Sequence, residues 1–211
     1  MSARAELLLD VLCVCVRALT RHQAMRLLGF SDEANFRRFV RDLIARGLVA
    51  QITVPAKPVP EMREPLYSWR ITDPRLTNGI IQHVLSLARA RWAGRPAVNT
   101  TVIAATSKAG RIYGAQRSGR PRKPLQCTHD IALSAVFVHK SIYQPVEAKN
   151  WYGEDFANLR LGNKTVDAVV SPGAGNVICK LIECVGADYT YDKLLTIARE
   201  AVSRGLPYEF W

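Results

Sequence analysis

The chain has 211 residues, of which 48% are hydrophobic, and 29 basic against 18 acidic residues give it a net charge of +11. This length suits one large domain or two small ones, and the charge favours a polyanionic partner. The apolar run of residues 7–16 is too short to span a bilayer and is interrupted by Asp10, and none of the five cysteines forms a Cys-x-x-Cys pair. We therefore expect a cytoplasmic protein with reduced thiols and no membrane association.

Residues 1–73 show the order helix, glycine turn, helix and hairpin. The expected helices cover residues 4–19, 21–28 and 32–46, and the expected strands cover 48–54 and 66–70. The third helix has an apolar stripe, and its opposite face carries Asn35, Arg37, Arg38 and Arg41. This order predicts a winged helix-turn-helix domain whose third helix enters the major groove. A protein-docking module is the alternative, but arginine and asparagine are residue types that reach phosphates and base edges.

Positive charge is concentrated in residues 74–129. This stretch contains ten basic residues and no Asp or Glu. A glycine- and proline-rich segment at 107–124 is expected to be an exposed loop that contacts DNA phosphates. Its cations are Lys108, Arg111, Arg117, Arg120, Arg122 and Lys123. The alternative is a solvated surface or a flexible basic loop.

The remaining elements indicate a second domain. We expect helices near 74–92, 131–142 and 191–202, and strands at 98–105, 143–148, 165–170, 177–185 and 208–211. The sequence thus predicts an α/β (α+β) chain, with the winged helix at 1–73 and a basic connector plus a small α/β domain at 74–211.

Two carboxylates interrupt apolar strands in this second half. Asp167 and Glu183 lie on consecutive expected strands, each among hydrophobic residues. A carboxylate in such surroundings is costly unless it is paired or binds a metal ion. Acids on adjacent strands can hold Mg²⁺ against a phosphate, so both are candidate metal ligands. The alternative is a pair of strand-edge acids that contact Lys or Arg.

Several short motifs resemble a known family. They are a helix starting near His129, Trp-x-x-Glu at 151–154, Val-Asp-Ala at 166–168, Ile-Glu-Cys-Val at 182–185, and the helix with Tyr191 and Lys193. In this order, after a winged helix, they resemble the replication-relaxation proteins of plasmids and conjugative elements. The C-type mobilisation relaxases share this layout and are related to the restriction-endonuclease-like PD-(D/E)XK fold. The resemblance implies that Asp167 and Glu183 bind the metal and that Glu154 is an auxiliary acid.

The chain departs from this pattern at one position. The family has Glu-x-Lys where this chain has Glu183-Cys184-Val185. Lys180 lies three positions earlier on the same strand and therefore points to the opposite face. Lys193 can reach the site from the following helix. We expect a degenerate nuclease site, in which Val185→Lys would, if anything, raise cleavage.

Three functions remain open. The first is a protein that binds double-stranded DNA of a mobile element, acts in replication or conjugative transfer, and associates with relaxosome or replication proteins or with a second copy of itself. The second is a metal-dependent DNA-nicking relaxase that uses Asp167, Glu183 and Lys193. The third is a transcriptional repressor whose second domain dimerises or binds a partner.

Overall fold

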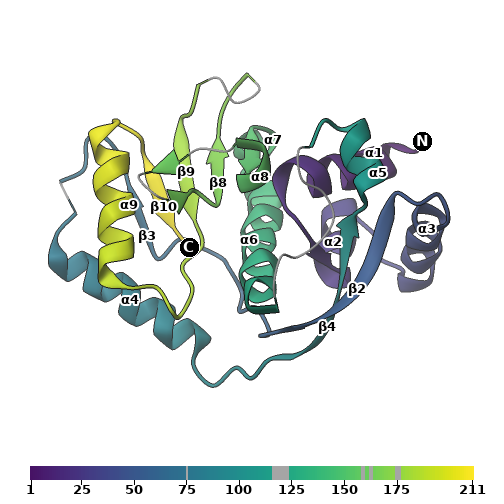
Figure 1. Ribbon diagram of the computed structural model, residues 1–211, viewed down its shortest axis with the longest axis horizontal. Coiled ribbons are helices and arrows are strands. Elements are labelled where there is room, and N and C mark those ends of the chain that lie inside the picture. The colour runs from purple at the N-terminus through teal and green to yellow at the C-terminus, as the bar shows by residue number, and fades with distance from the viewer. Residues whose placement is uncertain (75, 116–123, 158–159, 162–163, 174–176) are drawn as a thin grey trace. The chain divides into compact units, whose positions relative to one another are not determined.

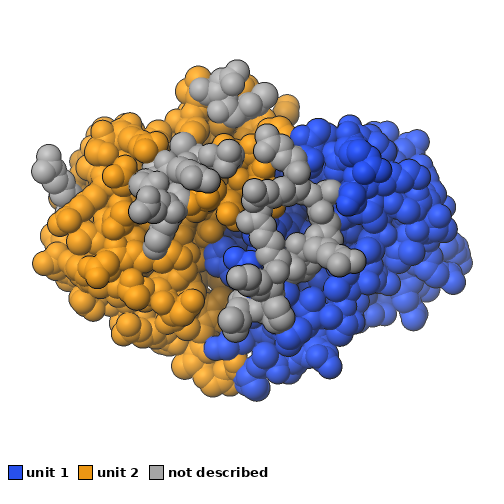
Figure 2. Space-filling model, in the orientation of Figure 1, with its two compact units in different colours: residues 1–59, 96–148 blue, residues 60–95, 149–211 orange. Residues whose placement is uncertain are grey.

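The computed structural model describes residues 1–74, 76–115, 124–157, 160–161, 164–173 and 177–211. The chain forms two compact units, which are coloured separately in Figure 2. Unit 1 consists of Met1–Val59 and Pro96–Ala148, and unit 2 consists of Pro60–Arg95 and Lys149–Trp211. The chain therefore crosses between the units three times. Its mixture of helices and sheets agrees with the expected α/β (α+β) class.

Unit 1 begins with helices in the expected order (Figure 1), but the first helical region ends at Cys15 and not at residue 19, because Val16 has an extended backbone and Leu19 belongs to a strand. Their bounds are α1 (Ala3–Asp10), the wider π-helical turn η1 (Val11–Cys15), α2 (Arg21–Leu28) and α3 (Glu33–Ala45). Thr20 and Gln23 form a capping box at the start of α2, and Gly29 ends it with φ +65°. Asp32 caps α3 by accepting hydrogen bonds from the amides of Ala34 and Asn35. Local capping therefore explains both boundaries of the turn between α2 and α3.

The sheet of unit 1 is built from segments that are distant in sequence. Its strands are β1 (Leu19–Thr20), β4 (Val98–Ala105) and β2 (Val49–Ala56), in that order and all antiparallel. β2 pairs with β4 along its whole length, from Val49 opposite Ala105 to Ala56 opposite Val98. The expectation that residues 66–70 pair with β2 is wrong. The eight residues of β4 match β2 in length, whereas 66–70 contributes only a three-residue strand elsewhere.

The other helices of unit 1 are α5 (Ser107–Ile112), α6 (Pro124–Tyr143) and α7 (Pro145–Lys149), the last residue of which already belongs to unit 2. α5 occupies part of the segment expected to be a loop, and α7 replaces the strand expected at 143–148. The buried ammonium of Lys140 explains α7, because it lies 2.8 Å from Gln144 Oε1 and 2.7 Å from Glu147 Oε2 and so holds this segment against the end of α6. α6 packs against β2 and α2. No helix in the described ranges is both long and apolar enough to cross a membrane.

Unit 2 is organised around a five-stranded sheet. Its order is β3 (Tyr67–Trp69), β10 (Tyr208–Phe210), β9 (Lys180–Glu183), β8 (Ala168–Val170) and β5 (Trp151–Gly153). β5, β8 and β9 form an antiparallel meander, and β10 joins β9 in parallel after the helix α9 (Tyr191–Ser203). The remaining elements are α4 (Asn78–Trp92), α8 (Glu154–Ala157), β6 (Arg160–Leu161) and β7 (Lys164–Thr165).

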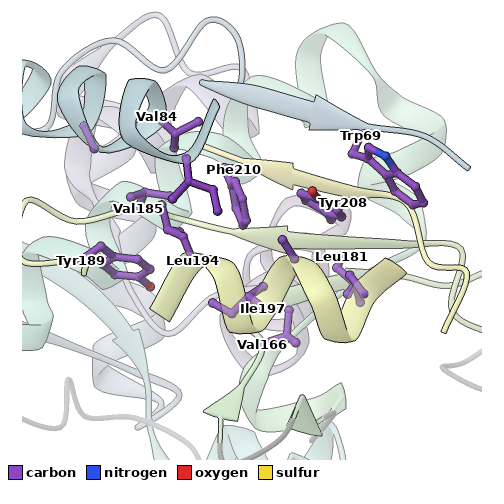
Figure 3. Packing of buried hydrophobic residues seen from close by; sticks show 14 of the residues in the cluster. Trp69, Val84, Val166, Leu181, Val185, Tyr189, Leu194, Ile197, Tyr208 and Phe210 are labelled. Carbon is purple, nitrogen blue, oxygen red and sulfur yellow. The ribbon is translucent and has the colours of Figure 1, made fainter. Parts of the chain in front are cut away.

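Two helices and the sheet enclose the core of unit 2 (Figure 3). α4 contacts α9, and side chains such as Val84, Leu194 and Ile197 pack with strand residues such as Leu181. Trp69 of β3 stacks on Tyr208, with 5.6 Å between ring centroids. β3 and α4 thus belong to unit 2, so the compact units divide the chain differently from the boundary expected at residues 73 and 74.

Candidate functional site

Helix α3 presents one apolar and one polar face. Phe36, Val40 and Leu43 are buried, which agrees with the stripe read from the sequence. The opposite side contains only exposed residues, namely Ala34, Asn35, Arg37, Arg38, Arg41 and Ala45. Because packing fixes the apolar side of α3, these residues are held toward solvent. We call the exposed set of Ala34, Asn35, Arg38, Arg41 and Ala45 the outer face of α3.

The arginines of α3 differ in their partners. Arg37 lies 3.9 Å from Glu33, which also binds Arg21 of α2 at 2.6 Å, and Arg46 after the helix lies 3.5 Å from Asp42. Arg38 and Arg41 contact no acidic side chain within the part of the chain that the structure describes. These two guanidinium groups are therefore available to an external anion.

The cations of the expected basic loop fall into three groups. Lys108 on α5 donates to the carbonyl of Arg46 at 2.9 Å, at the C-terminal end of α3, where a cation is favourable. Arg111, also on α5, is exposed. Arg117, Arg120, Arg122 and Lys123 lie outside the described residues.

Net charge is distributed unequally between the two units. Unit 1 contains 16 basic and 7 acidic residues, a net charge of +9, whereas unit 2 contains 13 and 11, a net charge of +2. The continuous basic stretch of the sequence is thus shared between the units, with Arg89 and Arg91 on α4 in unit 2 and Lys108 on α5 in unit 1. The positive field belongs mainly to the unit that contains α3.

The two candidate carboxylates lie together in unit 2. Ala168 is opposite Ile182 in the antiparallel pairing of β8 with β9, so Asp167 is opposite Glu183 at the end of the ladder. Asp167 Oδ2 accepts from the Cys184 amide at 2.8 Å, and Glu183 Oε2 accepts from the Asp167 amide at 3.4 Å. Both side chains are buried, at 8% and 4% exposure. We call Asp167 and Glu183 the carboxylate pair.

Tyr189 and Lys193 complete the surroundings of Glu183. The phenol of Tyr189 donates to Glu183 Oε1 at 2.6 Å. Lys193 Nζ lies 3.9 Å from the same oxygen and 3.1 Å from the centroid of the Tyr189 ring, a cation–π contact. Burial of the phenol raises the pKa of Tyr189 well above its ordinary value, and the negative charge of Glu183 is the second largest cause of this shift. Tyr189 therefore remains a hydrogen-bond donor at neutral pH.

The carboxylate pair meets the requirements of a magnesium site only in part. Carboxylate oxygens are ligands that Mg²⁺ prefers, but Glu183 already accepts from Tyr189 and faces the positive charge of Lys193. Glu154 begins α8, and its amide donates to the Asp167 carbonyl at 2.9 Å. Among the described residues, no three or more His, Cys, Asp or Glu side chains form a group that could hold a metal ion. Glu154 therefore does not complete a three-ligand set with the pair.

Val185 occupies the position where the family pattern has lysine. It is fully buried in the core of unit 2, where it packs with Val84 and Leu194 (Figure 3). The indole of Trp92 donates to its carbonyl at 3.2 Å. The structure gives no support to the expectation that Val185→Lys would raise cleavage, because a lysine there would be placed in the apolar core. Lys180 contacts Glu209 at 2.8 Å, away from the carboxylate pair.

Sequence reasoning missed Tyr189 as part of this site. Its neighbour Tyr191 starts α9, and its phenol contacts Asn78 of α4 instead. Nothing in the segment Asp-Tyr-Thr-Tyr at 188–191 distinguishes the two phenols. Thr190, which caps α9 by accepting from the Lys193 amide, was the one available signal, because it fixes where the helix starts and hence where each tyrosine points.

Tyr189→Phe should lower the free energy of unfolding by about 1–3 kcal/mol at pH 7, because it leaves a buried carboxylate oxygen without its phenol donor. The raised pKa adds a pH dependence. The contribution of Tyr189 to the free energy of unfolding is fully present below about pH 10, the ordinary tyrosine pKa. This contribution falls as the pH rises above that value. The stability difference between wild type and variant should thus be constant up to about pH 9 and narrow above pH 10.

Urea denaturation from pH 7 to 11 measures this difference. Tyr143→Phe, at a phenol that is 64% exposed, is the matched control and should change stability by less than about 0.5 kcal/mol. A difference for Tyr189→Phe that widens above pH 10 would contradict the assigned hydrogen bond.

Val185→Lys should lower the free energy of unfolding by about 3–5 kcal/mol, the cost of a buried charge without compensation. Val185→Met has a similar length without the charge, and urea denaturation of both variants separates the charge from the added volume. Equal stability of the two variants would show that the ammonium group leaves the core.

Comparison of the chain with protein-family models, with curated proteins and with solved structures found no match. The function is therefore inferred from the residues and their arrangement.

Proposed function

We propose that this protein binds double-stranded DNA site-specifically through α3 of unit 1, and that it acts on replication or transfer DNA of a mobile element. The observation that carries the proposal is the outer face of α3. Arg38 and Arg41 project from it without an acidic partner among the described residues, in a unit with a net charge of +9. Such a helix and such a field are typical of a protein that neutralises phosphates and reaches base edges.

The order of elements in unit 1 supports a winged helix-turn-helix. α2 and α3 are joined through the turn at Gly29, and the antiparallel ribbon of β2 and β4 follows. In this arrangement the second helix of the motif lies in the major groove and the ribbon acts as the wing. Residues 60–95 are then an insertion between the two strands of the wing.

Unit 2 supports a nuclease-like domain with a degenerate site. The carboxylate pair lies at the end of two neighbouring strands, as the resemblance to mobilisation relaxases implies. Its oxygens are engaged by backbone amides, by Tyr189 and by Lys193, and the position of the missing lysine is in the core. These contacts favour a structural role for the pair. Association with relaxosome or replication proteins, or with a second copy of the chain, is part of this proposal.

Removing Arg38 and Arg41 together, by Arg38→Ala with Arg41→Ala, should abolish selectivity for the preferred duplex while the protein stays folded. Both side chains are exposed, so circular dichroism should not change. The matched control is Arg89→Ala with Arg199→Ala, which removes two exposed arginines from unit 2. Fluorescence anisotropy with the preferred duplex and a scrambled duplex measures selectivity. Equal loss of selectivity in both double variants would refute the assignment to α3.

The position of Lys193 favours a second candidate, a metal-dependent DNA-nicking enzyme. Its ammonium group lies 3.9 Å from Glu183 Oε1, so a cation from α9 reaches the carboxylate pair although the strand lacks its lysine. Mg²⁺ held by Asp167 and Glu183 would supply Lewis-acid assistance to phosphate cleavage. Lys193 would then offset the growing negative charge on the phosphate.

The wild-type protein should leave supercoiled plasmid intact in the presence of Mg²⁺, because the carboxylate pair is occupied by contacts within the chain. Gel electrophoresis of the plasmid after incubation checks this, with Asp167→Asn and Lys193→Ala as comparison variants. Strong nicking by the wild type that both variants lose would establish the second candidate in place of a degenerate site.

A further inference from the structure

The partners of the α3 arginines predict which of them read DNA. Arg37 and Arg46 would have to leave Glu33 and Asp42, carboxylates of their own chain, before they could bind DNA. Arg38 and Arg41 have no such competitor within the described segments. Each can offer the full planar fork of its guanidinium group to an acceptor pair.

The neighbours of these two arginines allow a close approach to DNA. Ala34 and Ala45 are exposed on the same face, one before and one after Arg38 and Arg41. Their short side chains leave the backbone of α3 free to approach the floor of a groove, and the major groove is wide enough to admit a helix. Two long arginines between short neighbours would then extend past the phosphates to the base edges.

The spacing of the arginines limits the site that they can read. Three residues of an α-helix rise about 4.5 Å along its axis, while successive base pairs are about 3.4 Å apart. A helix that follows the groove therefore places Arg38 and Arg41 over base pairs one or two steps apart. The commonest specific partner of arginine in the major groove is guanine, whose O6 and N7 match the guanidinium fork.

We propose that Arg38 and Arg41 each bind one guanine in the major groove, so that the recognised duplex contains two guanines one or two base steps apart. This inference rests on the proposed function, that is, on DNA binding through α3. It adds the base that is read and the spacing of the two bases.

Selection from a random duplex pool by the wild-type protein, followed by anisotropy measurements on the selected site, tests the proposal. Replacing either guanine should weaken wild-type binding about 5- to 150-fold. Arg38→Ala should remove the preference at one guanine and Arg41→Ala at the other. Arg37→Ala, at an exposed arginine next to Arg38, is the matched control and should keep both preferences.

A second measurement needs no protein variant. Substituting 7-deazaguanine removes the N7 acceptor and should weaken wild-type binding about 10-fold at each selected guanine. This measurement keeps the test valid even if a variant folds poorly.

The outcomes separate the inference from the proposed function. Absence of duplex binding by the wild type overturns both. A selected site without the guanine pair, or guanine preferences that survive Arg38→Ala and Arg41→Ala, overturns the inference and leaves DNA binding intact. Equal weakening on every sequence assigns these arginines to phosphates and likewise overturns the inference.

Discussion

The antiparallel pairing of β2 with β4 determines how this chain is divided. Ala56 and Val98 are opposite each other at one end of the ladder, and residues 60–95, which lie between them in the sequence, belong to unit 2. That intervening segment supplies β3 and α4, which contribute Trp69 and Val84 to the core of unit 2. The ladder thus joins the two parts of the chain that form unit 1. It also leaves residues 60–95, the insertion between β2 and β4, to form part of unit 2. Closing a loop of this length costs entropy that grows only slowly with its length. The eight residue pairs of the ladder, among which Val49, Ala56 and residues 102–105 are buried, offset this cost.

This division changes the meaning of the charge pattern. In the sequence, the basic residues between 74 and 129 form one acid-free stretch, yet the fold assigns its first part to α4 in unit 2 and its later part to unit 1. Unit 1, which contains the outer face of α3, has a net charge of +9. Within α3, ion pairs to Glu33 and Asp42 neutralise some arginines and leave others available. The account of DNA binding depends on this local difference between arginines and not on total charge alone.

Features that depend on residues close together in the sequence could be predicted, whereas features that depend on residues far apart in the sequence could not. α2, α3 and α9 lie where their 3.6-residue periodicity, capping residues and terminal glycines place them, because these signals are local. The partner of β2 could not be predicted, since alternation identifies strands but not which strands pair. α7 was missed because the buried Lys140 that holds it lies on the preceding helix. The apolar context of Asp167 and Glu183 was sufficient to identify the carboxylate pair. The burial of Val185 and the role of Tyr189 depend on the packing of α4 and α9, which no local pattern contains.

Amide hydrogen exchange, with and without a selected duplex, tests the central claim most directly, because it reports on every described element of the intact chain at once. The account predicts that DNA slows exchange in α3 and in the β2–β4 ribbon, and that α9 and the strands around the carboxylate pair change little. Protection confined to unit 2, with α3 unaffected, would contradict it.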